Sequence, residues 1–143
     1  MFEKSLYRKA RMQMVSGNEQ KGLEILAKLM EKKPDIDKMR EGAEKLFGTH
    51  DFKGFSSLGK TKKSTVRTIN SIEITEADGI ISVKINGSGF LYNMVRIVVG
   101  TLLEIGTGEL PVSIIDTVFE GKTRAQAGTT LPARGLKLTE VFY

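Results

Sequence analysis

The sequence predicts an α+β protein with a mainly antiparallel sheet and helices packed on one face. Residues 66–75 and 80–85 alternate apolar and polar side chains around a turn signal at 77–79, which is typical of a β-hairpin. Residues 91–105 carry apolar side chains at helical spacing, and a last strand is predicted at 136–142. Helices and strands do not alternate strictly, which favours an antiparallel sheet over a parallel one.

The first 33 residues are predicted to form a helical extension or insertion before a domain at residues 34–143. Gly17 and Asn18 are expected to divide this segment into two short helices. Its apolar side chains recur at helical spacing, at Leu23, Leu26, Leu29 and Met30.

A helix is predicted after Pro34, with Asp35 or Asp37 as its N-cap. Gly48 is placed to end this helix in the left-handed conformation. The expected apolar stripe consists of Met39, Ala43, Leu46 and Phe47.

Glycines and a proline punctuate the second half of the sequence. Residues 87–89 break the strand, and residues 106–108 end the helix that begins near Leu91. Pro111 fits the first turn of a further helix, which runs to Glu120 and closes at Gly121.

The composition excludes several kinds of site. The chain has no cysteine and one histidine, so disulfides are excluded and a zinc or transition-metal centre is not expected. There is no nucleophile-elbow or P-loop motif. No apolar run is long enough to span a membrane, and residues 1–11 lack the apolar core of a signal peptide. We therefore expect a soluble cytoplasmic protein.

Positive charge gathers in one segment. The net charge is +5, while residues 71–143 are slightly acidic. Residues 51–70 hold one acidic residue and five basic ones: Lys53, Lys60, Lys62, Lys63 and Arg67. A local basic cluster is the footprint of a polyanion-binding surface. The alternative is a solvated lysine loop that serves solubility.

Aromatic rings accompany this basic cluster. His50, Phe52 and Phe55 lie just before or within it. Basic and aromatic side chains together suit RNA, because cations bind phosphates and aromatic faces stack on unpaired bases. The alternative is that Phe52 and Phe55 belong to the core and His50 caps the preceding helix. The sequence leaves both interpretations open.

Arg96 stands between Val95 and Ile97, inside the most apolar predicted helix. By spacing it shares a stripe with Tyr92, four residues earlier. It is either an arginine on an exposed face, which is common, or a guanidinium placed at a cleft to pair with a carboxylate or phosphate.

In order, these fragments resemble the tRNA pseudouridine synthase A family. The most specific string is F-L-Y-N-M-V-R at residues 90–96. The order and spacing of further residues support the resemblance: His50-Asp51-Phe52, Arg67-Thr68-Ile69, Gly100, Ala133, Gly135, Leu136 and Leu138. The resemblance covers roughly residues 37–143.

The resemblance implies an isomerase that turns uridine into pseudouridine in the tRNA anticodon arm, at positions 38, 39 and 40. It implies a homodimer that uses no metal and no organic cofactor. Each chain would fold as two αβ halves around a basic cleft, with the catalytic aspartate in an R-T-D-A-G-V-H-type motif. No such motif occurs in this sequence. We therefore expect a C-terminal half that lacks its N-terminal catalytic half and is inactive alone.

Residue by residue, the resemblance implies three contributions to the active site. Arg96 matches the arginine that pairs with the catalytic aspartate, and Leu136 matches the apolar residue near the flipped uridine. Tyr92 is a weaker candidate for the cleft wall, whereas Asp51 belongs to the H-D-F pattern and is not the nucleophile. The candidates for RNA binding are His50, Phe52, Lys60, Lys62, Lys63 and Arg67.

Two other functions remain open. One is a stand-alone RNA-binding module without catalysis, as the lysine cluster suggests. The other is an assembly role, in which exposed surfaces make a dimer.

Overall fold

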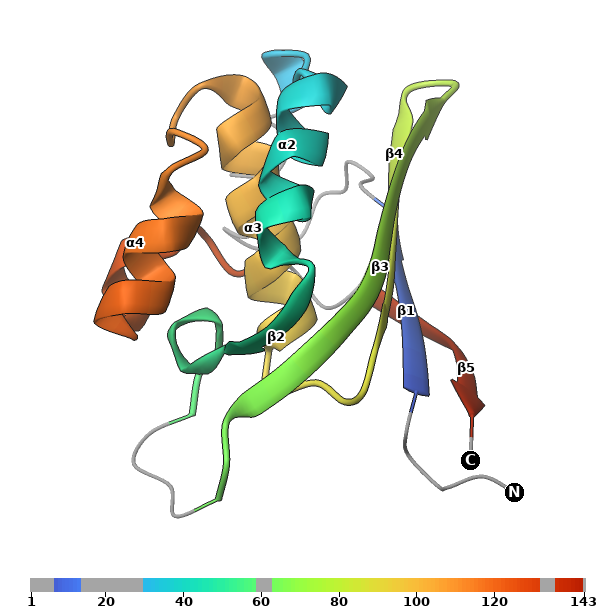
Figure 1. Ribbon diagram of the computed structural model, residues 1–143. Helices are drawn as coiled ribbons and strands as arrows, with labels where there is room; N and C mark the ends of the chain where they lie inside the picture. The colour runs from blue at the N-terminus through green and yellow to red at the C-terminus, as the bar shows by residue number, and fades with distance from the viewer. Residues whose placement is uncertain (1–6, 14–29, 59–62, 132–135, 143) are drawn as a thin grey trace.

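The computed structural model describes residues 7–13, 30–58, 63–131 and 136–142. Its sheet has the strand order β2-β3-β4-β1-β5, and all neighbouring strands are antiparallel. Helices α2, α3 and α4 lie on one face of this sheet (Figure 1). The predicted α+β class is therefore confirmed. The strands are β1 (Tyr7–Gln13), β2 (Gly48–Asp51), β3 (Val66–Ala77), β4 (Ile80–Gly87) and β5 (Leu136–Phe142), and the helices are α2 (Ile36–Leu46), α3 (Met94–Thr107) and α4 (Ile114–Gly121).

Strand β1 corrects the prediction for the N-terminal segment. Residues 7–13 form a strand between β4 and β5, where a helix was expected. Most of their side chains favour helices intrinsically, but pairing on both sides satisfies the backbone groups along the strand. Tertiary hydrogen bonding thus overrides local propensity. The predicted helical residues 14–29 lie outside the described part of the chain.

The predicted hairpin is confirmed as β3 and β4. Asp78 and Gly79 both have positive φ, 53° and 75°, as the tight turns that match strand twist require. The register shifts between Ile69 and Ser71, so that Ile69 and Ile74 are both buried although they are five positions apart. Val66, in contrast, is 47% exposed.

Helix α2 begins and ends close to its predicted limits. Asp35 is the N-cap, and its carboxylate accepts hydrogen bonds from the backbone N–H groups of Asp37 and Lys38. Gly48 has the expected positive φ. The prediction that Phe47 belongs to the core was wrong, because it is 53% exposed. The helix stops at Leu46 and the chain is extended at Phe47, which takes this side chain off the buried stripe.

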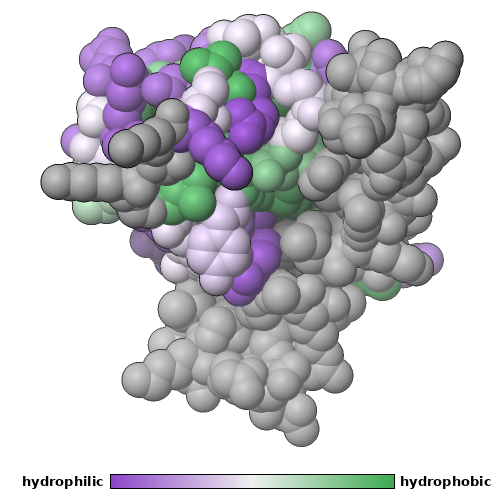
Figure 2. Space-filling model, turned by 90° about the horizontal axis from the view of Figure 1, so that it is seen from below, coloured by the Kyte–Doolittle hydropathy of each residue, from purple (hydrophilic) through white to green (hydrophobic). Residues whose placement is uncertain are grey.

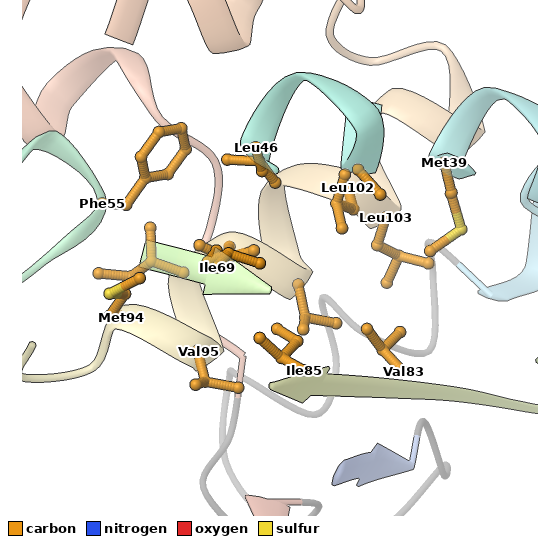
Figure 3. Close-up of a cluster of buried hydrophobic side chains, with 14 of the residues drawn as sticks. Met39, Leu46, Phe55, Ile69, Val83, Ile85, Met94, Val95, Leu102 and Leu103 are labelled. Carbon is orange, nitrogen blue, oxygen red and sulfur yellow. The ribbon is translucent and has the colours of Figure 1, made fainter. Parts of the chain in front are cut away.

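Helix α3 is the centre of the core. Met39 and Leu46 of α2 lie over Leu102 and Leu103 of α3, with side chains of the sheet beneath them (Figure 3). Helix α3 begins at Met94, three residues later than predicted, and ends at Thr107, where Gly108 follows in the left-handed conformation. It is buried on almost every side, so the few polar groups that it carries need partners within the fold.

Helix α4 likewise begins later than predicted. Pro111 precedes it, and the carbonyl of Pro111 accepts a hydrogen bond from Ile114 N–H, 3.0 Å away. The helix ends at Gly121, as expected.

Candidate functional site

Arg96 is held at the start of α3 by two hydrogen bonds. Its Nε donates to the carbonyl oxygen of Leu131, 2.6 Å away, and its Nη1 donates to Oδ1 of Asn93 at 2.8 Å. The side chain is half-buried. Leu131 lies five positions before Leu136, the first residue of β5, whose side chain is outside the described set. The guanidinium is therefore fixed against the chain segment that leads to the last strand.

Among the described residues, no carboxylate pairs with Arg96 and no acceptor contacts its Nη2. A guanidinium carries five N–H donors in a planar fork, so donors remain on Nη1 and Nη2. The group can accept an anionic partner from elsewhere, because a carboxylate or phosphate fits this fork.

Helix α3 also holds the segment before Leu131. The backbone N–H of Gly128 donates to Oγ1 of Thr101 at 2.9 Å, and that of Thr129 donates to Oε1 of Glu104 at 2.6 Å. Gly100 lets this segment approach, because a Cβ there would overlap the carbonyl oxygen of Thr129. Leu131 and Arg96 are thus parts of one rigidly packed unit.

Arg124 supports the same segment from its other side. Its two terminal nitrogens donate to the carbonyl of Ala127 and the hydroxyl of Thr130. Burial lowers the pKa of Arg124, and the Glu104 carboxylate opposes that shift. This arginine is engaged within the fold and serves the local structure.

Tyr92 lies in the turn before α3 with 64% of its surface exposed. Its carbonyl oxygen accepts a hydrogen bond from the backbone N–H of Ser57 at 3.0 Å. The beginning of α3 is therefore tied to the segment that leads into the lysine cluster.

Of the residues predicted to bind RNA, Arg67 lies near this end of α3. Lys63 is exposed, and Arg67 is half-buried with its Nη1 donating to the carbonyls of Ser64 and Val66. A Cβ on Gly89 would stand 3.6 Å from Nε of Arg67, which places this arginine beside the connection into α3. Figure 2 views the molecule from the end where α3 begins and shows hydrophilic residues beside apolar ones. Lys60 and Lys62 lie outside the described residues.

The aromatic residues of the basic segment correct one prediction. Phe52 and Phe55 are fully buried and pack against Phe119 at centroid distances of 5.3 and 5.4 Å. Phe52 therefore offers no free face to a base, and the core alternative holds for both residues. His50 stacks on Phe119 at 4.3 Å, and its Nε2 lies 2.9 Å from the carbonyl of Phe47, at the end of α2.

Asp51 organises the turn that follows β2. Burial alone would raise its pKa, but hydrogen bonds from Thr65 and the Lys53 N–H, together with the Lys122 ammonium, leave the pKa below its usual value. These contacts stabilise the ionised carboxylate, so Asp51 has a structural role in this turn.

A sequence model described as tRNA pseudouridine synthase matches residues 43–143. The chain belongs to this family. The resemblance to tRNA pseudouridine synthase A is thus confirmed, and the F-L-Y-N-M-V-R string falls within the matched part.

Sequence identity to individual tRNA pseudouridine synthases supports the same family. Over 112 residues the chain is 46% identical to "tRNA pseudouridine synthase A" of Clostridium kluyveri, which covers 78% of this chain and 46% of that protein. Over 111 residues it is 50% identical to "tRNA pseudouridine synthase A 1" of Clostridium tetani, covering 78% and 45%. The chain spans about half the length of the curated relatives it matches.

The described part of the chain was also compared with the requirements of a metal site and of a membrane span, and it meets neither. No group of three or more histidine, cysteine, aspartate or glutamate side chains is arranged there to hold a metal ion. Within the same residues, no helix has the length and apolar character needed to cross a membrane.

Sequence reasoning singled out Arg96 as a candidate but missed its hydrogen-bond partners. Asn93 and Leu131 hold the guanidinium, and Thr101 and Glu104 hold the segment beside it. The one available signal was an asparagine just before a helix, which is usually interpreted as a cap.

Proposed function

We propose that this chain is the C-terminal half of a tRNA pseudouridine synthase that isomerises uridine in the tRNA anticodon arm, at positions 38, 39 and 40. Arg96 is the partner of a catalytic aspartate carried by the other half. The observation that carries the proposal is the anchored, half-buried guanidinium of Arg96, which has a free Nη2 among the described residues.

The chemistry of the reaction is compatible with an aspartate from one half and an arginine from the other. The reaction breaks the bond from uracil N1 to ribose C1′ and forms a bond from C5 to C1′. The C5 hydrogen leaves as a proton and N1 gains one, so no electron acceptor is needed. An aspartate that attacks must be ionised inside the cleft, and a nearby guanidinium lowers its pKa and fixes its direction.

The pocket for the flipped uridine follows from the same placement. A target base must leave its stack to reach a buried carboxylate. Leu136 begins β5, a short distance along the chain from the Arg96 anchor at Leu131. We assign Leu136 to the apolar wall of the uridine pocket and the exposed Tyr92, as a weaker candidate, to the wall of the cleft.

The tRNA surface completes the proposal. Lys60, Lys62, Lys63 and Arg67 contact phosphates of the substrate, and His50 lies at the border of this surface. The complete enzyme works as a homodimer in the cytoplasm, without a metal or an organic cofactor.

The test restores the missing half. This chain is co-expressed with the part of the Clostridium kluyveri relative that it does not cover, and tritium release from tRNA with 5-tritiated uridine is measured. We expect release with both parts and none with either alone. Arg96→Ala should lower kcat/KM about ten- to a hundredfold, because the charge-assisted hydrogen bond that keeps the catalytic aspartate ionised and oriented is lost. Arg40→Ala, which removes an exposed arginine of α2, is the matched control. Unchanged activity of Arg96→Ala would refute the assigned role.

A non-catalytic RNA-binding module is the second candidate, favoured by the basic segment on a near-neutral body. It predicts tight, salt-sensitive tRNA binding by this chain alone, together with no tritium release after the other half is supplied.

A further inference from the structure

We propose that Asn93 is a positioning residue for Arg96, which turns the guanidinium toward the carboxylate supplied by the other half. This inference rests on the proposed function and adds a second residue to the same site.

The amide of Asn93 is engaged at both ends. Because Nη1 of Arg96 can only donate, the atom that it contacts at 2.8 Å is the carbonyl oxygen of Asn93. Nδ2 of Asn93 then faces Oγ of Ser57, 3.1 Å away. The amide cannot rotate without losing both hydrogen bonds, so Arg96 receives a fixed acceptor.

Two anchors define the plane of the guanidinium. Nε is held by the Leu131 carbonyl and Nη1 by Asn93, and these nitrogens lie on the same planar group. With both occupied, rotation about the side-chain bonds is blocked. Nη2, which has no acceptor among the described residues, then points in one direction.

The backbone of Asn93 is independent support. Its φ is +60°, a left-handed conformation that asparagine tolerates better than most residues. Asn93 is also the N-cap of α3, yet its side chain makes no capping hydrogen bond to the helix. An asparagine at this position normally binds the free N–H groups of the first turn. Here the amide is directed to Arg96 and Ser57 instead.

The experiment uses the co-expressed enzyme with three substitutions. Asn93→Gly keeps the left-handed backbone and removes the amide. Asn93→Asp keeps an acceptor for Arg96 but adds a negative charge, which competes with the catalytic carboxylate for the Arg96 guanidinium. Asn70→Ala, which removes the exposed amide bonded to Asn86, is the matched control. We expect kcat to fall about fivefold or more in both Asn93 variants, with KM for tRNA within about twofold of the parent and the control unchanged.

A second measurement needs no activity. In the parent chain, the Arg96 Nη protons should give separate NMR signals because rotation is slow. In Asn93→Gly they should merge, while the Nε–H bonded to Leu131 stays protected from exchange.

The outcomes distinguish the positioning role of Asn93 from the proposed role of Arg96. Parental kcat in Asn93→Asp would overturn the inference, because a carboxylate at this position should form an ion pair with the Arg96 guanidinium and draw it away from the catalytic carboxylate. So would an Asn93→Gly enzyme with parental kcat while Arg96→Ala is impaired. If Arg96→Ala is itself fully active, the proposed function fails as well. Should Asn93→Gly not fold, kcat of Asn93→Asp decides.

Discussion

Gly100 and Thr129 are packed backbone to backbone, so closely that a Cβ on Gly100 would overlap the carbonyl oxygen of Thr129. This approach brings the segment 127–131 onto α3, where it bonds to Thr101, Glu104 and Arg96. The position of Leu131, and with it one anchor of the guanidinium, depends on this single missing side chain.

Gly100→Ala should therefore displace the segment and destabilise the fold. The clash is with backbone atoms, which cannot swing away as a side chain can, and overpacking of this kind costs about 1–3 kcal/mol. Urea denaturation of the parent and variant chains measures the loss. Gly42→Ala is the matched control, because its Cβ would meet the ends of the Leu102 and Ile105 side chains. Equal effects of the two substitutions would contradict the backbone-contact interpretation.

Phe52→Ala should destabilise the chain by about 3–5 kcal/mol, the usual loss when a buried aromatic ring is removed. The ring is fully buried and packs against Phe55 and Phe119. Thermal denaturation followed by circular dichroism would show the loss. His50→Ala should cost less, because its ring is only half-buried. Parental stability of the Phe52→Ala chain would contradict the role of this ring in the core.

Asp51 should make stability depend on pH in the acid range. Its folded-state pKa lies below the usual value of an aspartate, so the ionised carboxylate stabilises the fold above that usual value. This contribution is lost as pH falls through the lowered folded pKa. Asp51→Asn should therefore be less stable than the parent at neutral pH, and the difference should shrink in strong acid. Urea denaturation at neutral pH and at about pH 2–3 tests this. If the difference in stability between Asp51→Asn and the parent is the same at both pH values, the ionised form of Asp51 does not stabilise the fold.

The lysine cluster should determine the salt dependence of tRNA binding. Each phosphate contact that is lost lowers the slope of log K against log salt by about 0.7–0.9. The triple substitution Lys60→Ala, Lys62→Ala and Lys63→Ala should reduce both affinity and slope. Filter binding at several salt concentrations, with Lys32, Lys38 and Lys84 replaced by alanine as the matched control, measures the change. Equal slopes for the two triple variants would show that this cluster does not bind phosphates.

Much of the fold could be predicted because local patterns agreed with tertiary packing. The alternation in β3 and β4, the turn at Asp78 and Gly79, and the limits of β5 follow from side-chain periodicity and from backbone conformations that few residues adopt. Strand β1 could not be predicted, since its residues favour helices and only pairing with β4 and β5 makes it a strand.

The sequence by itself determined the family and the α+β class, because these depend on residue order and periodicity, and it singled out Arg96 as a candidate. The tertiary structure alone decided which aromatic rings are buried and which groups hold the guanidinium. Asn93 is close to Arg96 in sequence, but Leu131 is 35 positions away and Ser57 is 36 positions from Asn93. Contacts between such distant residues form only when the chain has folded, because packing against α3 brings the partners together. Local propensity does not predict such contacts.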